Sequence, residues 1–506
     1  MKRRELIRTA VSAGALNFVG LGSDFMAQQS REASSHTEGD KLPEVSGLTH
    51  YVAEFVLNAS YEGIPAEVVA LGKKSILDGF GLALAGSASE MGAICRRYVQ
   101  SMCPTQGSST IIGSPQKATP RFAAFANGVS IHADDFDDTQ LAVAKDRTYG
   151  LLTHPTAPVL PAIFAIAEDS AASGKDLLTA YQAGVEVETK IAEAISPRHY
   201  EEGFHSTGTC GSFGSAAACA KMRGLKIEQT LSAFGIVAAE AAGVRENFGT
   251  MTKPFQAGHA AENGVAAADL ASLGWTGAEQ VLEAKRGFFH AYGGSYNPAA
   301  IQKKLGNPWT FASPGVSLKP YPSGSLTHPA MGAMLRLVKK YNLRPGDVEK
   351  IDVGTNRNMP NTLIHHRPMN GLQAKFSMEY CVALILLERK ASLAHFTDEF
   401  VKRADIQELL QRVNFYVDPI AENAGYDKMT SLISLHMKDG RLLKDQADFA
   451  KGSPADPMTF EDAAAKFRGC AEFAKWPTAK TQAIIEAVST LERAANLKKL
   501  ASLLQA

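Results

Sequence analysis

The chain has 506 residues, more than one hydrophobic core normally serves, so its length predicts two or more domains and an interior deep enough for an active site. Lysine plus arginine number 52 and aspartate plus glutamate also number 52. This balance excludes a global field that would attract nucleic acid or an anionic membrane. The composition, 45% hydrophobic and 21% charged, is typical of an ordered globular protein.

The N-terminus has the pattern of an export signal. Basic residues at 2–4 precede an apolar stretch over 10–21, which is shorter than the ~20 residues that a membrane anchor needs. The order Arg3-Arg4-Glu5-Leu6-Ile7 is similar to a twin-arginine signal, whose cargo crosses the membrane already folded. We therefore expect an export signal over 1–27, a polar linker over 28–42, a periplasmic location, and membrane contact only during export.

Apolar residues recur at helical spacing through much of the first half of the chain. The segments are rich in alanine and glycine, which permits close helix packing and favours an all-α domain over a βαβ repeat. The predicted helices cover 65–84, 121–132, 158–172, 174–195, 211–222 and 227–242.

The pattern changes from about Lys319, where short β-branched runs begin. They predict strands over 350–353 and 412–417, and a hairpin whose strands, 432–437 and 441–445, flank a glycine turn. A helix is predicted between them, over 376–387. The tail over 460–504 returns to amphipathic helix, and we expect it to pack back on the first domain.

These segments predict a mostly α fold with a large all-helical domain and a smaller mixed α/β lid domain. The helical domain comprises 43–316 and 447–506, and the lid comprises 317–446. A cleft is expected between the two.

Six cysteines are scattered without a C-x-x-C pair, so neither a zinc knuckle nor an iron–sulfur cluster is indicated. Free buried thiols are expected. An oxidising compartment would also permit a disulfide between Cys95 and Cys103.

The densest polar cluster is the segment 132–139, which reads His-Ala-Asp-Asp-Phe-Asp-Asp-Thr. Four carboxylates this close repel one another, and they need a cation, hydrogen-bond donors or raised pKa values to coexist. The cluster indicates a functional site. The alternative is a structural one, because Asp and Thr are ordinary helix-capping residues.

The same residues fit the Asp-Asp-x-x-Asp motif of helical terpenoid synthases, which hold magnesium through such carboxylates. The chain offers no second metal-binding motif on a later segment, and export makes an isoprenoid diphosphate an unsuitable substrate. A magnesium-dependent synthase therefore stays a remote alternative.

Further ionisable residues stand beside glycine or proline, at His154, His205, Lys253 and Lys319. Such residues lie at loops or element ends, where side chains project into clefts. Histidine has the unperturbed pKa best suited to proton transfer near neutral pH.

In this order, these segments resemble the MmgE/PrpD family, whose activities include 2-methylcitrate dehydratase, cis-aconitate decarboxylase and iminodisuccinate epimerase. The resemblance covers nearly everything after the signal. The segments that carry it are 132–139, His154-Pro155, Gly203-Phe204-His205, Thr252-Lys253-Pro254, 319–328 and 376–380.

The resemblance implies a homodimer and a pocket that needs neither metal nor cofactor. It assigns catalytic roles to His154, His205, Asp135 and Tyr380. It assigns substrate binding to Thr139, Lys253, Lys319 and His328. In this scheme the lysines neutralise the carboxylates of a small polycarboxylic acid, while the histidines move protons at the carbon beside them.

The chain departs from the family pattern at Gly324, where the decarboxylase that it resembles has a pocket histidine. Decarboxylation of cis-aconitate is therefore doubtful, although His328, one helical turn onward, is a candidate substitute. The segment 140–152 is also longer than expected and would reshape the pocket mouth.

We expect a metal-independent lyase of the dehydratase type that abstracts a proton next to a carboxylate of a di- or tricarboxylic acid. An epimerase or decarboxylase on a similar acid is the alternative. A non-catalytic periplasmic binder is more remote, because both histidines are present.

Overall fold

The computed structural model describes residues 45–103, 105, 107–141, 151–196, 198–425 and 428–506. The predicted export signal and linker lie outside these residues, as does 142–150, which is most of the long segment before His154. Among the described helices, none is long and apolar enough to cross a membrane.

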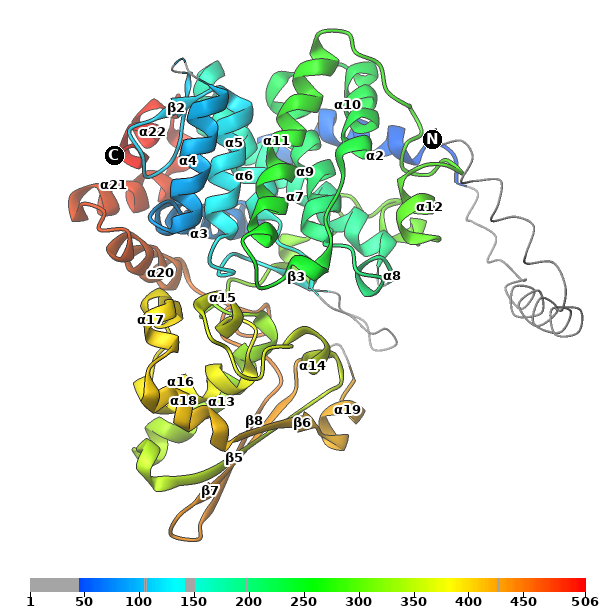
Figure 1. The fold of residues 1–506 in the computed structure, drawn as a ribbon. Coiled ribbons are helices and arrows are strands. Elements are labelled where there is room, and N and C mark those ends of the chain that lie inside the picture. The colour runs from blue at the N-terminus through cyan, green and yellow to red at the C-terminus, as the bar shows by residue number, and fades with distance from the viewer. Residues whose placement is uncertain (1–44, 104, 106, 142–150, 197, 426–427) are drawn as a thin grey trace, which may run out of the picture. The chain divides into compact units, whose positions relative to one another are not determined.

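Residues 45–316 form a helical part in which α11 lies against both α5 and α9, while α9 also packs on α7 (Figure 1). Its helices are α2 (Leu48–Asn58), α3 (Ala66–Ser87), α4 (Glu90–Met102), α5 (Pro120–His132), α6 (Thr156–Ser170), α7 (Gly174–Ile195), α8 (Arg198–Glu201), α9 (Ser206–Arg223), α10 (Ile227–Glu240), α11 (Thr252–Ser272) and α12 (Phe288–Gly293).

Glycines let the two helices that carry most of the candidate site approach closely. A Cβ on Gly258 of α11 would lie 2.5 Å from Cγ2 of Val129 and 2.6 Å from the carbonyl oxygen of Phe125, both on α5. A Cβ on Gly128 would lie 2.9 Å from the Cα of Gly258. The backbones therefore nearly touch, which brings the C-terminal end of α5 next to the N-terminal end of α11.

The predicted helices are present, with shifted ends. Helix α7 has the predicted bounds, because Ser173 and Asp176 form a capping box at its start. Helix α9 begins five residues before the predicted start at 211. Its first turns contain Gly208, whose added Cβ would lie 2.4 Å from the carbonyl oxygen of Ala242. Close packing there outweighs the low helix propensity of glycine.

The part predicted to be all-helical also contains two short antiparallel ribbons. They are β1 (Ser109–Thr110) with β2 (Lys117–Ala118), and β3 (Gln140–Leu141) with β4 (Leu151–Thr153). Runs this short have no hydrophobic periodicity for a sequence pattern to detect. The second ribbon matters for function because β4 leads directly into His154.

The later part of the chain contains a four-stranded sheet in the order β6-β5-β7-β8. Strand β5 pairs parallel with β6 and antiparallel with β7, and the predicted hairpin joins β7 to β8 through Gly440 at φ 86°. Helices α13 and α16 contact the sheet. The elements are α13 (His328–Tyr341), β5 (Val348–Thr355), α14 (Asn358–Thr362), α15 (Gly371–Ala374), α16 (Met378–Glu388), α17 (Asp398–Val401), α18 (Ala404–Leu409), β6 (Val413–Val417), α19 (Pro419–Asn423), β7 (Ser431–Met437) and β8 (Leu442–Ala447).

The C-terminal tail packs back on α3, as expected. It forms α20 (Phe460–Phe473), α21 (Thr478–Ser489) and α22 (Lys498–Leu504). Lys466 of α20 forms an ion pair of 2.8 Å with the buried Asp78 of α3 and donates to the carbonyl oxygen of Phe136 at 2.7 Å.

The mostly α fold with a smaller mixed part is confirmed, whereas the predicted domain boundaries stay a prediction. Cys95 and Cys103 are both free.

The close approach of α5 and α11 predicts that Gly258→Ala destabilises the fold by about 1–3 kcal/mol, as overpacking of a tight contact does. Gly332→Ala is the matched control. It also lies inside a helix, but its added Cβ would meet only Nη1 of Arg336, at 3.9 Å. Urea unfolding should show a lower midpoint for the first variant and an unchanged or higher one for the second. Equal midpoints would contradict the packing argument.

Candidate active site

The candidate site begins where α5 ends. His132 is the last residue of α5, and the chain turns back within five residues so that Asp137 contacts its ring. The turn places Asp135 at φ 50°, a left-handed conformation that aspartate tolerates better than most residues. In this conformation both its carbonyl and its carboxylate face Lys319.

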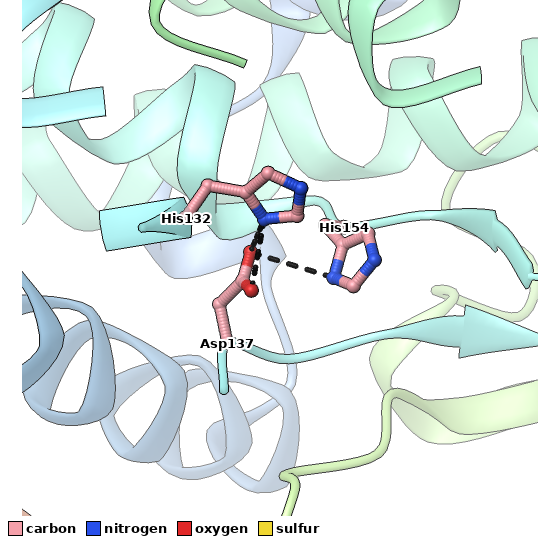
Figure 2. Close-up of side chains that lie close together, drawn as sticks. All are labelled: His132, Asp137 and His154. Carbon is pink, nitrogen blue, oxygen red and sulfur yellow. Dashed lines mark hydrogen bonds and ion pairs between the residues drawn. The ribbon is translucent and has the colours of Figure 1, made fainter. Parts of the chain in front are cut away.

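Figure 2 shows the carboxylate of Asp137 between two imidazole rings. Its oxygens lie 2.9 and 2.8 Å from Nδ1 of His132, and one lies 3.4 Å from Nδ1 of His154. Nδ1 of His154 also donates to the carbonyl oxygen of Asp138 at 3.0 Å. Burial opposes ionisation of Asp137, but the two imidazoles outweigh it and lower its pKa well below the ordinary value.

Lys253, at the start of α11, fixes the protonation of His132. Its Nζ lies 2.8 Å from Nε2 of His132. An ammonium group can only donate, so Nε2 must accept and the ring proton must be on Nδ1, facing Asp137. Burial lowers the pKa of His132, in keeping with a neutral ring.

Two buried lysines share one carboxylate. Lys253 forms an ion pair with Oδ1 of Asp135, and Lys319 contacts Oδ2 at 3.0 Å and the carbonyl oxygen at 2.7 Å. Burial would raise the pKa of Asp135, but the lysines outweigh it and hold the pKa far below the ordinary value. Asp135 balances one of the two ammonium charges, and the ammonium group of Lys253 lines the cavity, where it can bind an anionic ligand.

His205 precedes α9 and presents an unpartnered ring nitrogen. Its Nδ1 lies 2.5 Å from Oε1 of Gln256 on α11. Its Nε2 is buried and has no hydrogen-bond partner among the described residues. Burial and the nearby Lys253 lower the pKa of His205 well below the ordinary value, so the ring is neutral.

These groups surround a small cavity of about 20 Å³. Asp135, His154, His205 and Lys253 line it from the helical part. The later part contributes the wall residues Gly324, Ser325, Leu326, Thr362, Leu363 and Phe376. The volume is close to that of one water molecule.

The structure brings together only part of the predicted set. His154, His205, Asp135 and Lys253 line the cavity, and Lys319 supports it through Asp135. Thr139 does not line it: its backbone pairs with Ser317, and its buried Oγ1 is without a partner among the described atoms.

The structure does not bring Tyr380 and His328 to the cavity wall, so the roles assigned to them stay predictions. The hydroxyl of Tyr380 donates to the carbonyl oxygen of His395, because α16 directs the side chain into the core. Nε2 of His328 donates to the carbonyl oxygen of Ser323 at 3.1 Å, so this ring does not replace the side chain absent at Gly324. Burial lowers the pKa of His328 to about 3.

Sequence reasoning missed several site residues. It did not assign roles to His132 and Asp137, although both belong to the acidic segment. Gln256 gave no signal, because a lone glutamine inside a helix is ordinary. A spacing of three from Lys253 places it on the same face of α11, which is the one pattern that would have suggested it.

The magnesium-dependent alternative requires acidic side chains that converge on open space, and the structure separates them. Asp134 forms a 2.8 Å ion pair with Lys375, and Asp135 is held by its two lysines. Asp138 accepts from Thr156 at 2.6 Å, and burial raises its pKa to about 7, where a carboxyl is a poor magnesium ligand.

One group of residues has the composition of a metal site. Within the described ranges, His132, Asp137 and His154 bring three potential ligand atoms within 4.8 Å of one another. A metal would need the lone pair of Nδ1 of His132. Lys253 donates to Nε2 of this ring, so Nδ1 carries the ring proton and has no free lone pair. The hydrogen bonds therefore account for the cluster without an ion.

Comparison with known proteins identifies related enzymes. The chain is 31% identical to human cis-aconitate decarboxylase over 452 residues, which covers 87% of this chain and 90% of the relative. It is 26% identical to an Aspergillus terreus cis-aconitate decarboxylase, over 91% of this chain and 96% of the relative. It is 24% identical to 2-methylcitrate dehydratase of Escherichia coli O157:H7, over 65% of this chain and 70% of the relative.

These relatives contradict the predicted periplasmic location. The cis-aconitate decarboxylases that match come from human, mouse and Aspergillus, and eukaryotic cells have no periplasm. A run of basic and apolar residues at an N-terminus is a short pattern that carries less information than a match over most of the chain. The prediction of twin-arginine export to the periplasm was wrong.

Two family models match in succession. The MmgE/PrpD N-terminal domain matches residues 50–300, which include α3 to α12 and His132, His154, His205 and Lys253. The MmgE/PrpD C-terminal domain matches residues 321–493, which include the four-stranded sheet and α20. Both halves of the cavity wall thus fall within matched regions, and the chain belongs to the MmgE/PrpD family of enzymes.

Proposed function

We propose that this enzyme is a lyase that moves a proton at the carbon beside a carboxylate of a small tricarboxylic acid. The observation that carries the proposal is the unpartnered Nε2 of His205 in the same cavity wall as Lys253. The names of the relatives, cis-aconitate decarboxylase and 2-methylcitrate dehydratase, support a tricarboxylic acid as the substrate class.

Lys253 is the group suited to bind the substrate carboxylate, because its ammonium group lines the cavity. When the α-proton leaves, the electron pair moves into the carboxylate and forms an enediolate. A fixed ammonium group stabilises that added charge. The rings of Phe248 and Phe376 flank Lys253, with Nζ 5.1 and 5.8 Å from their centroids, and they limit access of water.

The neighbouring groups suggest different roles for His205 and His154, one as the base and the other as the acid. His205 has a neutral amide as the partner of Nδ1, and no carboxylate among the described residues is hydrogen-bonded to its ring, so it is the candidate base. His154 lies 3.4 Å from Asp137, which stabilises an imidazolium, so it is the candidate acid. Burial lowers the pKa of His154 to about 3. The negative charges of a bound tricarboxylate raise this pKa and favour the protonated form of His154.

In a dehydration, His205 takes the α-proton and the C–O bond to the β-hydroxyl breaks. His154 then gives its proton to the departing oxygen to form water. The substrate loses H₂O, and the two histidines exchange protonation states. Solvent restores them before the next cycle.

This scheme predicts that His205→Ala lowers kcat by about 100- to 10,000-fold, as loss of a general base does. His436→Ala is the control, because this residue lies on β7, where it contacts Asp352. Initial rates with citrate, 2-methylcitrate and cis-aconitate measure the effect, and circular dichroism confirms folding. A fully active His205→Ala variant would show that His205 is not the base.

Decarboxylation of cis-aconitate is the second candidate function. The 31% identity to the human decarboxylase favours it. Two observations oppose it: the position expected to carry a pocket histidine is Gly324, and the ring of His328 is hydrogen-bonded to the carbonyl oxygen of Ser323. Protonation of the carbanion left by carbon dioxide would then depend on His154.

Gly324→His tests this candidate directly. A Cβ at Gly324 would lie 3.3 Å from Cδ2 of Leu363 and no closer than 3.5 Å to other atoms, so a side chain begins there without severe overlap. We expect the substitution to raise carbon dioxide release from cis-aconitate by about tenfold or more, the low end for a proton donor. Gly324→Leu is the control, because it adds a side chain of similar volume that cannot donate a proton. An equal change in both variants would show that volume, not the imidazole, sets the rate.

We also propose the homodimer that the family resemblance implies. Large apolar side chains gather on α4 and the start of α11, with Ile94 39%, Tyr98 47% and Phe255 44% exposed. They line a groove of about 350 Å³, and an apolar patch of this kind is typical of a protein–protein contact.

A charge placed in this groove should separate the subunits. We expect Tyr98→Glu to halve the mass measured by light scattering after size exclusion, because an ionised side chain is costly in an apolar contact. Tyr341→Glu, at a tyrosine 39% exposed on α13, should leave the mass unchanged. A wild-type monomer would contradict the proposal.

A further inference from the structure

The hydrogen bonds of Gln256 determine which end of its amide faces His205. Its Nε2 donates to the carbonyl oxygen of Val244 at 3.0 Å. Only the NH₂ group can donate to a carbonyl, so Oε1 must be the atom 2.5 Å from Nδ1 of His205. An amide oxygen only accepts. The ring therefore carries its proton on Nδ1.

The remaining ring nitrogen follows from this assignment. With the proton on Nδ1, Nε2 of a neutral His205 has a free lone pair. The structure leaves Nε2 buried and unpartnered among the described residues, and His205 belongs to the cavity wall. The tautomer set by Gln256 is thus the one that offers a base to a bound substrate.

Backbone contacts fix the position of His205 relative to Gln256. His205 N–H donates to the carbonyl oxygen of Gly243 at 3.0 Å. Gly243, at φ 150°, is close to both residues: an added Cβ would lie 3.3 Å from Oε1 of Gln256 and 3.4 Å from Cβ of His205. The segment that accepts from Gln256 at Val244 therefore also anchors His205.

The charged and titratable groups around the ring disfavour its protonation. His132 of α5 stacks against it with centroids 5.8 Å apart, and His154, before α6, adds a second imidazole. Lys253 of α11 supplies a positive charge. The nearby carboxylate, Asp135, is already engaged by Lys253 and Lys319.

We propose that Gln256 is a positioning residue that holds His205 as the neutral Nδ1–H tautomer and so makes it a base and not an acid. This role rests on the proposed function, in which His205 abstracts the proton. A carboxylate in place of the amide would do the opposite, because a negative charge beside Nδ1 favours the imidazolium.

Gln256→Glu tests the role through the pH profile. The new carboxylate should raise the pKa of His205, and the acid limb of kcat/KM should move to higher pH by about 1 to 3 units, the usual effect of an adjacent opposite charge. Activity at high pH should recover to within a few-fold of wild type. Gln256→Leu, which removes the acceptor without adding charge, should lower kcat at every pH and leave the limb unmoved. An equal loss without a shift in both variants would indicate a merely structural role and overturn the proposal.

Nitrogen-15 NMR of histidine-labelled enzyme gives a readout that needs no turnover. The His205→Ala spectrum identifies the signals of His205. We expect Nδ1 protonated and Nε2 unprotonated in wild type from pH 6 to 8, and ring protonation that begins at a higher pH in Gln256→Glu than in wild type. A proton on Nε2 in wild type would overturn the proposal. An enzyme inactive on every acid tested, but with the expected tautomer, would refute the proposed function and leave the role of Gln256 in place.

Discussion

The candidate site depends on the burial of two lysines around one carboxylate. Lys253 and Lys319 are 3% and 1% exposed, and taking their charges out of water is costly unless each has a partner. Asp135 supplies that partner to both. Because Lys253 belongs to α11 and Lys319 precedes α13, this carboxylate also links the helical part to the mixed part. The link explains why Asp135 keeps a left-handed conformation, since strain of this kind persists where surrounding contacts fix it.

The same constraint shapes the protonation of the neighbouring histidines. Lys253 must donate, so Nε2 of His132 accepts and its proton faces Asp137. Gln256 places the proton of His205 on Nδ1 in a similar way. Hydrogen bonding requires a neutral ring at His132 and sets the position of the Nδ1 proton at His205, while burial lowers the pKa of both rings. A neutral His205 beside the fixed positive charge of Lys253 suits abstraction of a proton from a carbon acid. Our account ranks dehydration above decarboxylation because Gly324 stands where the decarboxylase that the chain resembles has a pocket histidine.

The sequence predicted the fold class and the segments of the site well, because long amphipathic helices and the run of aspartates at 134–138 leave strong local signals. It predicted His154, His205, Asp135 and Lys253 as neighbours only through family resemblance, since their contacts join α5, β4, α9 and α11. Two of the predicted site residues lie away from the cavity for physical reasons. Tyr380 and His328 have suitable chemistry, but local packing directs their polar atoms to the carbonyl oxygens of His395 and Ser323. Gln256 contacts His205, which is 51 positions away in the sequence, and its spacing of three from Lys253 is the one local pattern that points to it.

The central claim is that this enzyme moves a proton beside a carboxylate without a metal ion. The most direct measurement is proton NMR of the EDTA-treated protein in deuterated water, with citrate, 2-methylcitrate, cis-aconitate and iminodisuccinate in turn. Our account predicts that deuterium enters at the carbon next to a carboxylate, or that product forms, with at least one tricarboxylic acid. Absence of exchange and product with all four acids, or activity that returns only when a divalent metal is restored, would contradict it.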